Sequence, residues 1–188
     1  MFTGKTSYLD QSSKLFYNYI DTGGLPYSFT DLYGKISLNG SNGSKLSFFG
    51  FNFDDHVDYQ FVSEYDWKSF GFGTNFVIVP GGSKVLIGGT ISYSDYEISL
   101  QEGDGLPRTS GINGFDLNID FTYFVPNGDI KYGFDIGGFR TELQFYNSLG
   151  LKIEQNNNTT ELSGFIVYKH IFNEKFILEP SLRLQYYA

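Results

Sequence analysis

The residues best suited to metal binding or catalysis are two histidines and the acidic groups around one of them. His56 stands in the segment DDHVD, where Asp54, Asp55 and Asp58 supply carboxylate oxygens of the kind that bind divalent cations. The spacing of an EF-hand loop is absent, however. We therefore favour a solvated acidic outer loop over a cation site and predict neither a bound metal nor a cofactor.

Enzymatic catalysis is not indicated elsewhere in the sequence. His170 stands beside an expected short turn, where an interfacial side chain is a better interpretation than a general base. No serine, histidine and acid occur together with supporting context, so a hydrolase is only a minor alternative and we predict no enzyme. The absence of cysteine excludes disulfides and thiolate chemistry.

Composition narrows the class of protein further. Aromatic residues make up 19% of the 188 residues. The formal net charge of −8 repels phosphate backbones and the sequence has no basic stripe, so we predict no nucleic-acid partner. No stretch approaches the roughly 18 apolar residues of a membrane-spanning helix. If the chain enters a bilayer, it does so as strands.

The clearest strand lies between Phe115 and Val125, where apolar and polar residues alternate strictly from Phe115 to Tyr123. Its length matters because a tilted strand needs about 9–11 residues to cross the hydrocarbon layer. The segment before the chain end repeats the alternation, with leucines on one side and charged residues on the other. The same pattern, with local defects, predicts strands at 31–39, 45–54, 65–79, 84–99, 112–125, 129–145, 159–172 and 175–187.

The predicted connections alternate in length. Short turns rich in Gly, Asn, Ser and Pro stand at 40–44, 80–83, 126–129 and 173–174, and longer polar links at about 54–64, 101–111 and 148–159. Short turns on one side and long loops on the other, with aromatic residues clustered beside the short turns, are typical of a transmembrane β-barrel. Either bulges or strand ends outside the bilayer are expected where the alternation slips, within 46–53, after Tyr93 and at 137–138.

This pattern assigns the two faces of the strands. We predict that the polar face lines a lumen and includes Asp116, Asn118, Asp120, Lys131, Glu161, Glu179 and Arg183. We predict that the apolar face contacts lipid and includes Phe115, Leu117, Ile119, Phe121, Tyr123, Leu178, Leu182 and Leu184.

Strand parity predicts that the chain is a piece of a larger barrel. The first expected strand leads into a short turn and the last follows one, so both ends fall on the long-loop side. Bacterial single-chain barrels normally start and finish on the periplasmic side, and an open sheet edge in lipid is very costly. Residues 1–30, around a TGGLP turn, are then expected to be the tail of an earlier strand plus an outer loop, and residues 31–188 eight strands of the wall.

Several segments also resemble a known family. They are TSYLDQSS (6–13), LPYSFTDLYGKISLNGSNGSKLSFFGFNF (25–53), GTNFVIVP (73–80), YSDYEISLQE (93–102), GFDLNIDFTYF (114–124) and EPSLRLQYYA (179–188). In this order they are similar to the barrel of TonB-dependent receptors that carry an N-terminal carboxypeptidase-regulatory-like domain. The similarity covers nearly the whole chain.

The resemblance implies a barrel of about 22 strands in the outer membrane of a Gram-negative cell. It implies import of a scarce nutrient, such as a siderophore or a glycan, with energy from TonB. Outer-membrane lipid, a plug domain, the TonB complex and a small-molecule or oligomer substrate would be the partners. Plug, TonB box and regulatory-like domain are not found in these residues. Two alternatives stay open: a small self-contained outer-membrane barrel with structural or adhesive loops, and a soluble β-sandwich binding module.

Overall fold

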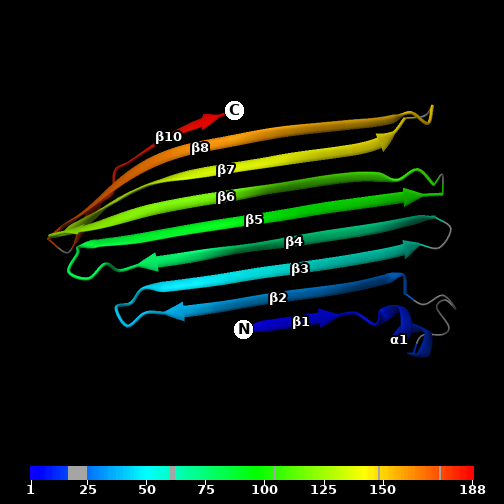
Figure 1. The fold of residues 1–188 in the computed structure, drawn as a ribbon, viewed down its shortest axis with the longest axis horizontal. Helices are drawn as coiled ribbons and strands as arrows, with labels where there is room; N and C mark the ends of the chain where they lie inside the picture. The colour runs from blue at the N-terminus through cyan, green and yellow to red at the C-terminus, as the bar shows by residue number, and fades with distance from the viewer. Residues whose placement is uncertain (17–24, 60–61, 104, 148, 174) are drawn as a thin grey trace.

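The fold is a single antiparallel sheet, seen in a computed structural model that describes residues 1–16, 25–59, 62–103, 105–147, 149–173 and 175–188 (Figure 1). The described elements are β1 (Phe2–Thr6), α1 (Leu9–Phe16), β2 (Tyr27–Asn39), β3 (Lys45–Tyr59), β4 (Ser63–Ile78), β5 (Val85–Glu102), β6 (Arg108–Val125), β7 (Gly128–Tyr146), β8 (Lys152–Phe172), β9 (Phe176–Leu178) and β10 (Ser181–Tyr187).

From β1 to β8 each described strand pairs with the next one along the chain, and β9 and β10 both pair with β8. The ten strands therefore form one sheet whose order follows the sequence from β1 to β10, and both of these lie at its edges (Figure 1). In the described chain, no helix combines the length and the apolar character needed to cross a membrane.

The registers contain no bulges at the places where the sequence pattern suggested them. Pairing of β3 with β4 runs unbroken from Lys45 opposite Val77 to Tyr59 opposite Ser63, and β7 pairs continuously through 137–138. The expectation of bulges there is wrong. Aromatic residues depart from the simple alternation because they lie on the polar side, over glycines of the neighbouring strand.

Phe51 shows how this aromatic packing works. A Cβ atom added to Gly71 on β4 would lie 2.6 Å from Cζ of Phe51 on β3. Likewise, a Cβ on Gly73 would lie 2.7 Å from Cζ of Phe49. The glycines of β4 thus leave room for rings from β3, and the ladder stays regular although large apolar residues interrupt the polar pattern.

The long links expected at 54–64, 101–111 and 148–159 are mostly strand. The actual connections there are 60–62, 103–107 and 147–151, because β3 to β8 continue well past the segments predicted as strands. The expectation of long loops is wrong for a physical reason. A polar segment can remain in a ladder when its neighbours extend equally far, since the backbone hydrogen bonds are satisfied regardless of side-chain polarity.

The two ends of the chain differ in detail from the expectation. The strand predicted at 175–187 is divided into β9 and β10 at Glu179 and Pro180, because proline has no N–H to donate to the ladder. Near the other end, β1 is followed by the helix α1, which was not expected. Residues 22–24 of the predicted TGGLP turn, and Glu174 of the predicted 173–174 turn, lie outside the described residues.

Candidate functional site

One face of the sheet, here called the apolar face, carries apolar side chains across strand after strand. Phe121 on β6 is opposite Tyr132 on β7, with the two rings stacked at a centroid distance of 5.3 Å. In the same row follow Ile166 on β8 and Leu182 on β10. Directly opposite residues share a face of the sheet, so the register makes this surface continuous. All eight residues predicted to contact lipid fall on it, namely Phe115, Leu117, Ile119, Phe121, Tyr123, Leu178, Leu182 and Leu184.

The opposite face, here called the polar face, holds a hydrogen-bonded network centred on Asp135 of β7. Asp135 accepts hydrogen bonds from the Asn118 side-chain amide on β6 and from the Ser163 hydroxyl on β8, the latter at 2.9 Å. Arg183 on β10 donates to Ser163 Oγ at 2.8 Å, and its guanidinium lies 3.2 Å from Asp135 Oδ2. Four neighbouring strands are thereby joined through side chains on one face.

A second ion pair continues this network along β6 and β7. Lys131 Nζ lies 3.4 Å from Asp120 Oδ2, a contact between residues that are diagonal neighbours in the register. Between the two pairs lies Gly133, opposite Asp120 and Phe165. A Cβ at Gly133 would meet the Ile119 carbonyl oxygen and lie 3.0 Å from the Phe165 ring, so the backbone and this ring fill the space beside the ion pairs.

The residues predicted to face a lumen are therefore placed as follows. Asn118, Asp120, Lys131 and Arg183 take part in the contacts just described. Asp116 and Glu161 lie on the same face, each opposite Gly137 of β7. Glu179 lies between β9 and β10, outside both strands. Asp135 and Ser163 were not among the predicted lumen-facing residues. Alternation places them on this face, but only the register shows that they meet.

Toward the 60–62, 103–107 and 147–151 connections the polarity of the two faces is inverted. We call this part of the strands the extension; it begins beyond the row that contains Phe115. Here Val57 lies opposite Tyr65, on the same face as the polar network. Its side chain is buried, with 9% exposed. Tyr65 stacks on Trp67 at 5.5 Å. The other face of the extension carries charged residues instead.

Asp55 lies on the same face of the extension as Val57, opposite Phe29 and Trp67. Partial burial raises the pKa of this carboxyl, and the negative charges of Asp31 and Asp54 raise the pKa further. An acid with a raised pKa is one whose charged form is disfavoured by its surroundings. The surroundings of Asp55 therefore disfavour the charged form of its carboxyl.

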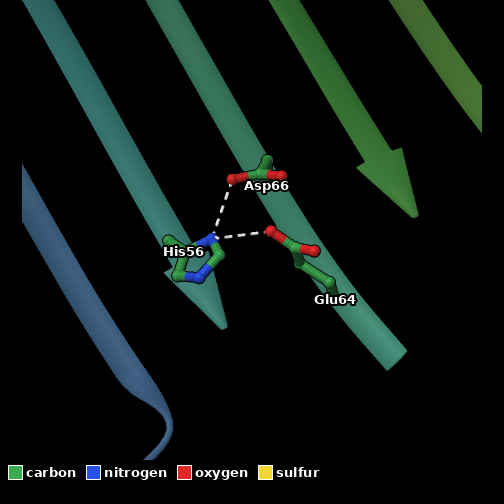
Figure 2. A group of neighbouring side chains, drawn as sticks. All are labelled: His56, Glu64 and Asp66. Atoms are coloured by element: carbon green, nitrogen blue, oxygen red, sulfur yellow. Dashed lines mark hydrogen bonds and ion pairs between the residues drawn. The ribbon is translucent and has the colours of Figure 1, made fainter. Parts of the chain in front are cut away.

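His56 lies on the other face of the extension, together with Glu64 and Asp66 of β4 (Figure 2). Its Nδ1 atom is 2.8 Å from Asp66 Oδ1 and 4.0 Å from Glu64 Oε1. The acidic partners suggested by the DDHVD segment are thus not the ones in contact with the ring. Asp55 points to the other face, and the carboxylates that approach His56 come from across the hairpin.

His170 lies at the opposite end of the strands, beside the 173–175 connection. The Tyr168 hydroxyl is 3.1 Å from His170 Nδ1, and the Phe172 ring meets the imidazole edge to face at 4.2 Å. Phe176 on β9 packs next to Phe172. The imidazole contacts described here are thus with aromatic side chains, and such a cluster beside a short turn is typical of an aromatic girdle.

A sheet with one apolar and one polar face, of strands longer than a bilayer crossing requires, has the fold of an outer-membrane β-barrel wall. Two solved structures support this assignment. The first is a double mutant of the hemophore receptor HasR of Serratia marcescens in complex with its hemophore HasA and heme, with a TM-score of 0.66 and 11% identity over 86% of this chain and 25% of that chain. The second is the outer membrane transporter YddB of Escherichia coli, with a TM-score of 0.55 and 10% identity over 99% of this chain and 39% of that chain.

The chain thus spans about a quarter of the receptor's length and about two fifths of the transporter's. No family model matches the sequence, and no curated protein matches it. The resemblance seen in the sequence and these two solved structures agree on the fold, which is that of an outer-membrane β-barrel wall. The predicted antiparallel barrel wall and location in the cell outer membrane agree with this fold, and both neighbours are named as a receptor or transporter rather than an enzyme.

Proposed function

We propose that this chain is a wall segment of a TonB-dependent outer-membrane receptor that imports a scarce nutrient. The observation that carries the proposal is the division of the sheet into a continuous apolar face and a face with the Asp135 network. In this proposal the apolar face contacts lipid. The polar face, with Asp116, Asn118, Asp120, Lys131, Glu161 and Arg183, lines the lumen and contacts a plug supplied by another part of the parent protein.

The edges of the sheet support a wall within a wider barrel. In the described residues β1 and β10 are not paired with each other, so each presents unpaired backbone groups. Such edges are very unfavourable in lipid. We therefore place further strands of the parent protein beside both edges, which favours a large barrel over a small self-contained one.

The alternative of a soluble sandwich has little support. A sandwich buries one face of each sheet against a second sheet, whereas here one sheet holds all ten strands. Large apolar residues on the apolar face are exposed, for example Leu182 at 61% and Phe115 at 52%. Lipid is the environment that covers such a face without a second layer.

Genetic interaction with TonB tests the proposed transport. In the native bacterium, strains that lack this protein, TonB or both would be compared for uptake of radiolabelled ferric chelates, cobalamin and oligosaccharides. We expect at least one compound whose uptake falls equally in both single mutants and no further in the double mutant. If every uptake affected by loss of this protein persists without TonB, the transport proposal is wrong.

A further inference from the structure

The group formed by His56, Glu64 and Asp66 has the composition and geometry of a metal site. One nitrogen and two carboxylate oxygens, one from each residue, all lie within 4.8 Å of one another. Figure 2 shows both carboxylates of β4 turned toward the same nitrogen of the His56 ring. Small shifts of three partly exposed side chains would therefore bring all three donor atoms onto one ion.

The register explains why these three donors meet. His56 is directly opposite Asp66, and Glu64 precedes Asp66 by two residues, so all three point to the same face of the β3–β4 pair. Opposite residues in an antiparallel ladder have their Cβ atoms about 5 Å apart. The donors are thus positioned by two paired strands rather than by a loop.

The charges of the cluster favour a cation. Two carboxylates face one imidazole, so a negative charge remains even when His56 is protonated. In the described part of the chain, the ionic contacts of Glu64 and Asp66 are those with His56. A divalent ion would balance both carboxylates while it keeps the imidazole neutral and coordinating.

We propose that His56, Glu64 and Asp66 bind a divalent transition-metal ion of the zinc class. An imidazole nitrogen with two carboxylate oxygens matches the N and O ligands of Zn²⁺, and water would fill the remaining position. Calcium is a poorer match because it takes about 6–8 oxygen ligands and the cluster contributes a nitrogen. The ion would cross-link β3 and β4 close to their connection and stabilise the extension.

The direct test is calorimetric titration of the full-length protein, purified in detergent, with ZnCl₂. We expect one saturable Zn²⁺ site per chain that excess CaCl₂ does not displace. His56→Gln, Glu64→Gln and Asp66→Asn should each weaken binding by at least about tenfold, since even outer-shell changes cost 10–100-fold at metal sites. His170→Gln is the matched control, because it removes the other histidine, at the opposite end of the strands, and should leave binding unchanged.

A difference in gel migration between unheated and heated samples would verify that each variant is folded. Visible absorption spectra of the wild-type protein with Co²⁺ test the site without any variant. We expect the d–d absorption bands of a Co²⁺ ion with few ligands, and we expect Zn²⁺ to abolish them. Absence of saturable Zn²⁺ binding, or binding that survives in His56→Gln and is lost in His170→Gln, would overturn the proposal. Neither result depends on transport, so the outcome is independent of the function proposed above.

Discussion

Arg183 on β10 lies 3.2 Å from Asp135 on β7, although β8 separates their two strands. The long arginine side chain also contacts Ser163 of β8, to whose hydroxyl oxygen it donates a hydrogen bond at 2.8 Å. Asp135 is the less exposed partner, at 25% against 53% for Arg183. The contact therefore fixes three strands relative to one another on the face that we assign to the lumen.

Removal of this contact should destabilise the barrel. Arg183→Met keeps most of the apolar stem but leaves Asp135 without its cationic partner, and we expect a loss of about 1 kcal/mol in the free energy of unfolding. Denaturant unfolding of the purified protein in detergent measures the change. Arg140→Met is the control, since Arg140 pairs with Glu142 on the same strand at 2.6 Å, and among the described residues this is its ion pair. Equal losses in the two variants would contradict the prediction.

A pair of arginine substitutions on β6 tests the assignment of the faces. Leu117→Arg places a charge on the apolar face and should cost about 2–4 kcal/mol, the range for arginine near the bilayer midplane. Asp116→Arg changes the adjacent residue on the polar face and should cost less than about 1 kcal/mol. Unfolding measured in lipid vesicles compares the two. If Asp116→Arg is the more damaging change, lipid lies on the other face.

Two glycines of β7 should respond differently to alanine. A Cβ at Gly133 would contact the Ile119 carbonyl oxygen and lie 3.0 Å from Asp120 Cα, and this backbone cannot move without disturbing the ladder. Gly133→Ala should therefore destabilise the protein by about 1–3 kcal/mol. Gly137→Ala should stay within about 0.5 kcal/mol of the wild type, because its new Cβ would have no neighbour closer than 3.8 Å. Denaturant unfolding checks both values, and a neutral Gly133→Ala would contradict the prediction.

Asp55 should make stability depend on pH in a defined direction. Its pKa is raised above the ordinary value of 3.8 by partial burial and by Asp31 and Asp54. A raised carboxyl pKa in the folded state means that the charged form opposes folding at neutral pH, and that this cost disappears as pH falls through the raised pKa. Asp55→Asn should thus be more stable than the wild type at pH 7, with a difference that shrinks on acidification. The comparison is of unfolding free energies at several pH values. A difference that grows toward low pH would contradict the assigned cause.

Much of the fold follows from the sequence alone, because its main signal is local. Alternation between Phe115 and Val125 requires only that successive side chains of a strand point to opposite faces, and it correctly separated Asp116 from Leu117. Turn chemistry is local too. Pro126 and Asn127 close the β6–β7 connection, with Asn127 at φ 62, a conformation that asparagine tolerates well. The type and direction of most strands therefore needed no tertiary information.

Contacts between strands were decided only by the tertiary structure. The partners of His56 were sought among its sequence neighbours, yet Glu64 and Asp66 approach it because the β3–β4 register places them opposite. The length of the strands was also misjudged, since the polar residues of the extension resemble a loop until the neighbouring strands are seen to continue beside them. Alternation assigns a residue to a face, but the position along that face depends on the register, which backbone hydrogen bonds between distant segments establish.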